Sequence, residues 1–126
     1  MVSGLQDRMK GKSAIANQYQ AQNTQFYTSA QDNITATPGA VQGTAILLMN
    51  SQNRITTAAA GSGVKLPPSQ QGACVVITND GASTTNVFPS TGDAINALGP
   101  NTAFALTVAL GPTIFYCFSP GTWRTK

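Results

Sequence analysis

The sequence predicts an all-β fold: a small antiparallel β-sandwich or barrel, preceded by an extended, partly helical N-terminal arm. Two observations predict it. Short apolar runs after residue 38 are separated by Gly, Pro, Asn and Asp about every 8–12 residues, as in sandwiches and barrels. Before the turn dipeptide Pro38-Gly39, the chain is rich in Gln, Asn, Ser and Thr. We therefore expect an arm at residues 1–37 and a β domain at residues 38–126.

The arm combines a weak helical rhythm with scattered aromatic residues. Leu5 and Met9 are four residues apart, and Ala16, Tyr19, Asn23, Phe26 and Ala30 follow a 3–4 spacing. Gly4 and Gly11 each lower helix propensity by about 1 kcal/mol relative to Ala, so we expect the arm to become ordered only in an assembly. The side chains predicted to bind a partner there are Leu5, Arg8, Met9, Lys10, Lys12, Tyr19, Phe26 and Tyr27.

Apolar stretches predict the strands of the β domain. They lie at residues 44–49, 54–57, 64–66, 73–78, 84–88, 94–98, 103–110 and 114–118, followed by an edge strand that carries Trp123. Asn79-Asp80-Gly81 predicts a tight hairpin that pairs residues 73–78 with residues 84–88. The aromatic residues expected to fill the core or a subunit interface are Phe88, Phe115, Tyr116, Phe118 and Trp123. An exposed aromatic platform for sugars is the alternative.

The residues that usually carry enzymatic chemistry are scarce. The chain has no His and no Glu, and only 9% of its residues are charged. His is the commonest general base and metal ligand, and two cysteines cannot build a four-thiolate zinc site. We therefore expect no enzyme, no cofactor and no metal. Asp80 and Asp93 are expected to accept hydrogen bonds from turn backbone, and Cys74 and Cys117 to be reduced thiols in the core, with a disulfide as the alternative in an oxidising compartment.

The net charge of +3 reflects a shortage of acids. Only seven Lys and Arg residues are present, with three of them between residues 8 and 12, which is a weak cluster for phosphate binding. We expect no specific nucleic-acid partner. The longest apolar runs are far shorter than the ~20 residues that span a bilayer, and no leader pattern opens the sequence. No membrane partner is expected.

Several motifs of the β domain together resemble those of tailed-bacteriophage virion proteins. They are Gly72-Ala73-Cys74-Val75-Val76-Ile77-Thr78-Asn79-Asp80-Gly81, Asn86-Val87-Phe88-Pro89, Gly92-Asp93-Ala94-Ile95-Asn96-Ala97-Leu98-Gly99, Phe115-Tyr116-Cys117 and Gly121-Thr122-Trp123. The chain looks like small capsid decoration (cement) proteins and like β modules of head and tail fibres. The resemblance covers roughly residues 40–126 and brings no catalytic residues.

The resemblance implies a structural protein on the capsid exterior of a virion that is assembled in the host cytoplasm. Its implied partners are further copies of itself, as a homotrimer at local three-fold axes, and the major capsid protein, which the arm would reach. Binding the assembled shell but not its open state would stabilise the shell by mass action. The alternative is a head-fibre or tail-fibre module that binds a host receptor or glycan. The arm lacks the sustained heptads of a fibre stalk, which favours the cement interpretation.

Overall fold

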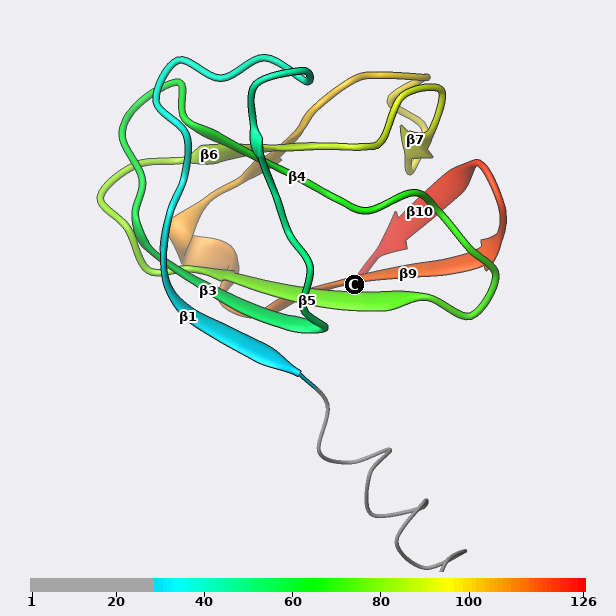
Figure 1. Ribbon diagram of the computed structural model, residues 1–126, viewed down its shortest axis with the longest axis horizontal. Coiled ribbons are helices and arrows are strands. Elements are labelled where there is room, and N and C mark those ends of the chain that lie inside the picture. Colours follow the sequence, from blue (N-terminus) through cyan, green and yellow to red (C-terminus); the bar gives the residue numbers. More distant parts are fainter. Residues whose placement is uncertain (1–28) are drawn as a thin grey trace, which may run out of the picture.

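The computed structural model describes residues 29–126, which form a β-rich domain of two facing sheets (Figure 1). One sheet has the strand order β1-β3-β5-β9-β10-β7, and the other has the order β2-β4-β6-β8. The elements are β1 (Ala30–Thr35), β2 (Ile46–Leu47), β3 (Gln52–Thr57), β4 (Gly63–Lys65), β5 (Cys74–Asn79), β6 (Thr85–Phe88), β7 (Ala94–Ile95), β8 (Phe104–Leu106), the 3-10 helix η1 (Val108–Leu110), β9 (Thr113–Ser119) and β10 (Thr122–Thr125). The predicted β-rich class is confirmed.

Strands β1 to β6 form a parallel solenoid rather than an antiparallel sandwich. Strands β1, β3 and β5 are parallel neighbours in the six-stranded sheet, and β2, β4 and β6 are parallel neighbours in the other. The chain therefore changes sheet after every strand and winds as a series of coils. Ala30 lies opposite Gln52, and Gln52 lies opposite Val76, so one coil leads from Ala30 to Gln52 and the next from Gln52 to Val76. The predicted purely antiparallel arrangement is wrong.

The segment Asn79-Asp80-Gly81 shows why the predicted hairpin does not form. The Asn79 side-chain amide donates hydrogen bonds to the carbonyl oxygens of Ser83 and Leu106, both at 2.9 Å, and Asn79 Oδ1 accepts one from the Gly81 N–H at 2.9 Å. A Cβ on Gly81 would lie 2.6 Å from the backbone nitrogen of Ala58 in the preceding coil. The turn packs against that coil and directs the chain into the opposite sheet, where β6 pairs with β4.

Antiparallel pairing closes the C-terminal end of the solenoid. β8 runs antiparallel to β6, β9 runs antiparallel to β5, and β10 runs antiparallel to β9. The predicted strand at residues 103–110 is only β8 followed by η1. The sequence places the strand carrying Trp123 at an edge, but β10 is internal because β7 pairs with its other side.

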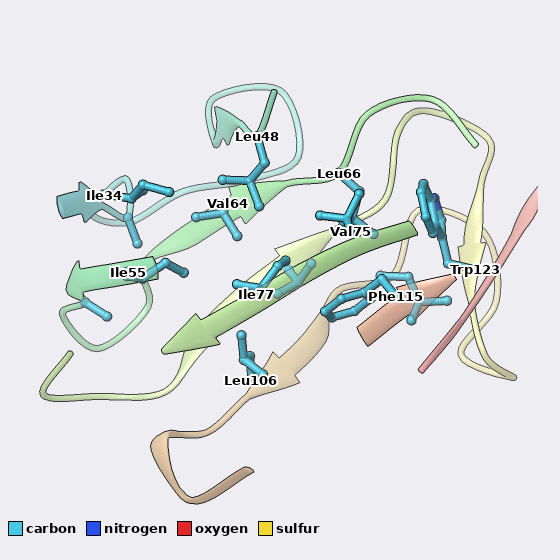
Figure 2. Packing of buried hydrophobic residues seen from close by; sticks show 14 of the residues in the cluster. Ile34, Leu48, Ile55, Val64, Leu66, Val75, Ile77, Leu106, Phe115 and Trp123 are labelled. Carbon is cyan, nitrogen blue, oxygen red and sulfur yellow. The ribbon is translucent and has the colours of Figure 1, made fainter. Parts of the chain in front are cut away.

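The core lies between the two sheets and runs the length of the solenoid (Figure 2). In Figure 2, Ile34 lies at the left end of this cluster, Trp123 at the right end, and Leu48 above Val64. The rings of Phe104 and Phe115 meet edge to face at 5.5 Å, which joins β8 to β9. The predicted buried strand at residues 44–49 is reduced to β2, whose two residues are exposed.

The predicted domain boundary falls after the first strand. The sequence assigns residues 30–35 to the arm, whereas the structure places them in β1 of the six-stranded sheet. The predicted partner-binding residues, Leu5 to Tyr27, lie outside the described residues.

Candidate interaction surface

The structure separates the five aromatic residues singled out from the sequence. Phe115 and Trp123 are fully buried between the sheets. Phe88 is half-buried, and its ring packs against the backbone of Gly63, where an added Cβ would lie 2.7 Å from Phe88 Cε2. Tyr116 is half-buried and Phe118 is 73% exposed. The first two residues belong to the core, and the last two belong to an outer surface.

Tyr116 and Phe118 form an aromatic pair on the outer face of the six-stranded sheet. Their ring centroids are 5.1 Å apart with an angle of 70° between the ring planes. Because alternate residues of a strand face opposite sides, Ile114 shares this face of β9, and Val76 lies opposite it on β5. We name Val76, Ile114, Tyr116 and Phe118 the outer strip. Arg124 and Cys74 lie opposite Tyr116 on the two neighbouring strands.

An exposed charge cluster occupies the β1–β3–β5 side of the same sheet. The Arg54 guanidinium contacts Asp32 at 3.1 Å and Asp80 at 2.8 Å. Asp32 lies in a bulge of β1, where Asn33 has a positive φ of 56° and its N–H donates to Asp32 Oδ1 at 2.7 Å. Beside the cluster lies an open depression of about 480 Å³ that Val76 and Pro112 also line.

The same contacts shift the pKa values of Asp32 and Arg54. The hydrogen bond from the Asn33 backbone, and then that from Arg54, hold the pKa of Asp32 below its ordinary value. Hydrogen bonds to Asp80 and then Asp32 raise the pKa of Arg54. The sequence predicts that Asp80 accepts a hydrogen bond from the turn backbone, but the Asp80 side chain pairs with Arg54 instead. Asn79 accepts the hydrogen bond from the Gly81 N–H of this turn. The cluster is exposed to solvent, so it orients charges on the surface more than it stabilises the fold.

Replacing Arg54 with Met should raise the pKa of Asp32 toward its ordinary value of 3.8, leaving it lowered only by the Asn33 amide. Because the folded-state pKa of Asp32 is lowered, its contribution to stability is present above the ordinary value and is lost as pH falls through the folded-state pKa. An NMR titration of the Asp32 carboxyl group measures the shift. Lys65→Met, on β4 of the other sheet, is the control. An identical Asp32 titration in Arg54→Met and wild-type protein would contradict the assignment.

The motif Gly92-Asp93-Ala94-Ile95-Asn96 holds the C-terminal strands in place. Asp93 Oδ2 accepts a hydrogen bond from the Ser69 N–H at 2.9 Å, so this aspartate bonds to distant backbone rather than to its own turn. The Asn96 amide donates to Thr125 Oγ1 at 2.8 Å and accepts from the Thr125 N–H at 3.1 Å. The Asn96 contacts attach the end of β7 to β10, and the Asp93 contact attaches the segment before β7 to Ser69, so the motif has a structural role.

The remaining candidate groups are not gathered into a chemical site in the described part of the chain. Cys74 is exposed and Cys117 is buried, and neither is in a disulfide within residues 29–126. The prediction that both thiols are core-packed is therefore wrong for Cys74. Residues 29–126 contain no group of three or more metal-ligating side chains. Over the same range, no helix has the length and apolar character that crossing a bilayer requires.

Comparison with known proteins gives no assignment. No family model matches the chain, and neither a curated protein nor a solved structure is significantly similar to it. The likeness to phage virion proteins therefore depends on the sequence motifs. The structure shows that the polar residues of these motifs hold turns and strands together. It also shows two features that the sequence alone does not reveal, which are the Arg54 cluster and the exposure of β2.

Proposed function

We propose that the chain is a structural virion protein that decorates and stabilises a tailed-bacteriophage capsid as a homotrimer at local three-fold axes. The outer strip is the observation that supports self-association. Phe118 is 73% exposed and Ile114 is 38% exposed, and both lie on the same face of one sheet as the Tyr116 ring. Apolar side chains grouped on one face mark an interaction site more than scattered ones do. Because a three-fold contact joins two different surfaces, each outer strip meets another part of the next copy.

The motifs that resemble those of phage virion proteins support the same proposal. Asn79, Asp93 and Asn96 use their polar side chains to hold turns and strands together. A decoration protein needs a rigid domain and a means of attachment, and it needs no reaction chemistry. In this proposal the β domain forms the trimer on the capsid exterior. The N-terminal arm contacts the major capsid protein in particles assembled in the host cytoplasm.

Light scattering tests the trimer. We expect the full chain to have about three times its mass of 13.0 kDa. Phe118→Asp should give a monomer, because burying an unpaired carboxylate at an interface is strongly unfavourable. Val41→Asp is the matched control, since Val41 is a 61% exposed apolar residue outside the outer strip. A wild-type monomer, or a Phe118→Asp trimer, would contradict self-association through this face.

Cosedimentation with capsids that lack the protein tests the attachment. We expect the triple variant Leu5→Ser, Met9→Ser, Tyr19→Ser to bind about a thousandfold more weakly or worse, because each buried apolar side chain contributes about 1.5–3 kcal/mol. The control replaces Gln6, Asn17 and Gln20 with Ser and should bind as the wild type does. Equal occupancy by both variants would show that these arm residues do not attach the protein.

The competing function is a head-fibre or tail-fibre module that binds a host receptor or glycan. One observation favours it: aromatic faces stack on sugars, and the exposed Tyr116–Phe118 pair has Arg124 beside it. Binding of the purified full chain to host cells, abolished by Phe118→Ala and accompanied by no binding to capsids, would establish this function and overturn the decoration proposal.

A further inference from the structure

The N-terminal end of the solenoid is open in the described part of the chain. Within residues 29–126, β1 ends one sheet and β2 ends the other, so neither has a strand on its outer side. At the opposite end, β8 and β9 cover the last coil with antiparallel strands. Solenoids need a cap at each end, because an uncovered coil exposes both strand edges and the end of the core.

The open end exposes apolar side chains around a groove. Ile46 and Leu47 are each 43% exposed, and Met49 is 82% exposed. Together with Ile34, Thr35 and Asn53 they line a groove of about 290 Å³ between β1 and β2. Ile34 on β1 and Leu48, which directly follows β2, are the core residues of these two end strands, and both are labelled in Figure 2. The groove is where a further coil would pack.

Asn53 points to an occupant that carries a hydrogen-bond donor. The residue is buried at 4% exposure, and its side-chain amide nitrogen donates to the carbonyl oxygens of Asn50 at 2.8 Å and Val76 at 3.3 Å. Its Oδ1 atom is buried with no hydrogen-bond partner among residues 29–126. A buried acceptor without a donor is unfavourable, and the backbone N–H of an added segment would satisfy it.

The chain enters its first coil already in register with the coil below. Ser29 accepts a hydrogen bond at its Oγ from the Ser51 N–H at 3.1 Å, and its carbonyl accepts one from the Gln52 N–H at 3.0 Å. Ser29 thus lies over Ser51, as Ala30 lies over Gln52. The segment before Ser29 is longer than the coil that leads from Ala30 to Gln52, so it is long enough to add another coil.

With the 22-residue offset of Ala30 and Gln52 kept through the preceding corner, residues 24–27 lie beside residues 46–49. Phe26 then falls over the core residue Leu48, and Tyr27 falls over Met49. The same 22-residue offset places Lys12 beside Ile34. A charged lysine there would not extend the apolar core. Terminal caps of solenoids cover the core on one side and present polar residues to solvent. Phe26 over Leu48, followed outward by polar residues, matches this description.

We propose that residues 24–28 of the chain's own N-terminal segment cover the open end, adding a parallel strand to β2 with Phe26 packed on Leu48. The cover shields the apolar rim of the groove and brings backbone donors to it. Residues 1–23 remain available for a capsid partner. The inference does not depend on the proposed function, since it concerns how the chain completes its own solenoid.

An engineered disulfide tests the register and the source of the cover. Gln25→Cys and Leu47→Cys, introduced into full-length Cys74→Ser protein, place two thiols on outward positions of neighbouring strands, which are about 5 Å apart. We expect an intrachain disulfide, visible as a faster monomer band on a non-reducing gel. Gln20→Cys with Leu47→Cys is the control and should not cross-link. An interchain dimer band would assign the cover to a second copy, and the absence of any cross-link would exclude the cover; either result overturns the proposal.

Hydrogen–deuterium exchange of the full chain gives a second test. Phe26→Ala should speed exchange at residues 46–49 about tenfold, because local opening becomes easier there, while residues 74–79 keep their protection. Tyr19→Ala is the control and should leave both segments unchanged. Unaltered exchange at residues 46–49 in Phe26→Ala would overturn the packing of Phe26 on this end.

Discussion

Replacing Trp123 with Ala should destabilise the domain by about 3–5 kcal/mol, the range for a buried large aromatic residue. Trp123 is fully buried and lies at one end of the core cluster, on a strand held between β9 and β7. Its removal leaves a cavity that the paired strands cannot close. Because domains of this size have stabilities of about 5–15 kcal/mol, the variant loses a large part of its stability. Chemical denaturation followed by far-UV circular dichroism measures the loss, since the variant has no tryptophan.

Trp123→Phe separates packing from hydrogen bonding at the same position. The indole Nε1 is buried without a hydrogen-bond partner in residues 29–126. Phe keeps most of the apolar contact and removes this polar group, so we expect less than half of the destabilisation seen with Ala. Val41→Ala, at a 61% exposed site, should stay within about 0.5 kcal/mol of wild type. A Trp123→Ala variant as stable as Val41→Ala would show that the Trp123 side chain contributes little to the stability of the core.

Apart from β1, which the sequence assigns to the arm, the strands lie within the predicted apolar stretches or within two residues of them, but their pairing does not follow from the sequence. An apolar run bounded by Gly, Pro or Asn has the same composition whether the next strand turns back beside it or crosses to another sheet. A weak repeat is present: the dipeptide Ile-Thr recurs at positions 34–35, 55–56 and 77–78. Ile34 lies opposite Ile55, but Ile77 lies opposite Asn53, two residues out of step. Ile34, Ile55 and Ile77 are all buried on the parallel strands β1, β3 and β5. The residues around this dipeptide differ between coils, which hides the repeat.

The candidate surface was predictable only in part for a related reason. In β9, one face carries Phe115 and Cys117, and the other carries Ile114, Tyr116 and Phe118. Both rows are apolar, so alternation alone does not decide which row faces the core. The decision comes from Phe104 on β8, which meets Phe115 across the sheets. Likewise, Arg54 is distant in the sequence from both Asp32 and Asp80, and only the coils of the solenoid bring the three together.

Replacing Asn79 with Ala should cost about 2–4 kcal/mol. The residue is 1% exposed, and its side chain makes three hydrogen bonds, to the carbonyl oxygens of Ser83 and Leu106 and from the Gly81 N–H. Ala leaves these backbone groups without their partner, and each unsatisfied buried group costs about 1–3 kcal/mol, partly recovered by water. Denaturation midpoints at constant slope measure the change. Asn86→Ala on β6 is the control, since no side-chain hydrogen bond is found for this half-buried Asn within residues 29–126.

The variant Asn79→Asp should lose an amount of stability that depends on pH. This dependence identifies the hydrogen bonds donated by the Asn79 side chain as the cause of the loss. A carboxylate still accepts from the Gly81 N–H, but it cannot donate to the two carbonyl oxygens and is repelled by them. Burial and these oxygens should therefore raise the pKa of the new aspartate above its unfolded value of about 3.9. With a raised folded-state pKa, the stability conferred by protonation is complete below the unfolded value and is lost as pH rises through the folded value. Asn79→Asp should thus regain stability relative to Asn79→Ala at acidic pH, while a constant difference between the two variants from acidic to neutral pH would contradict the role of Asn79 as a donor.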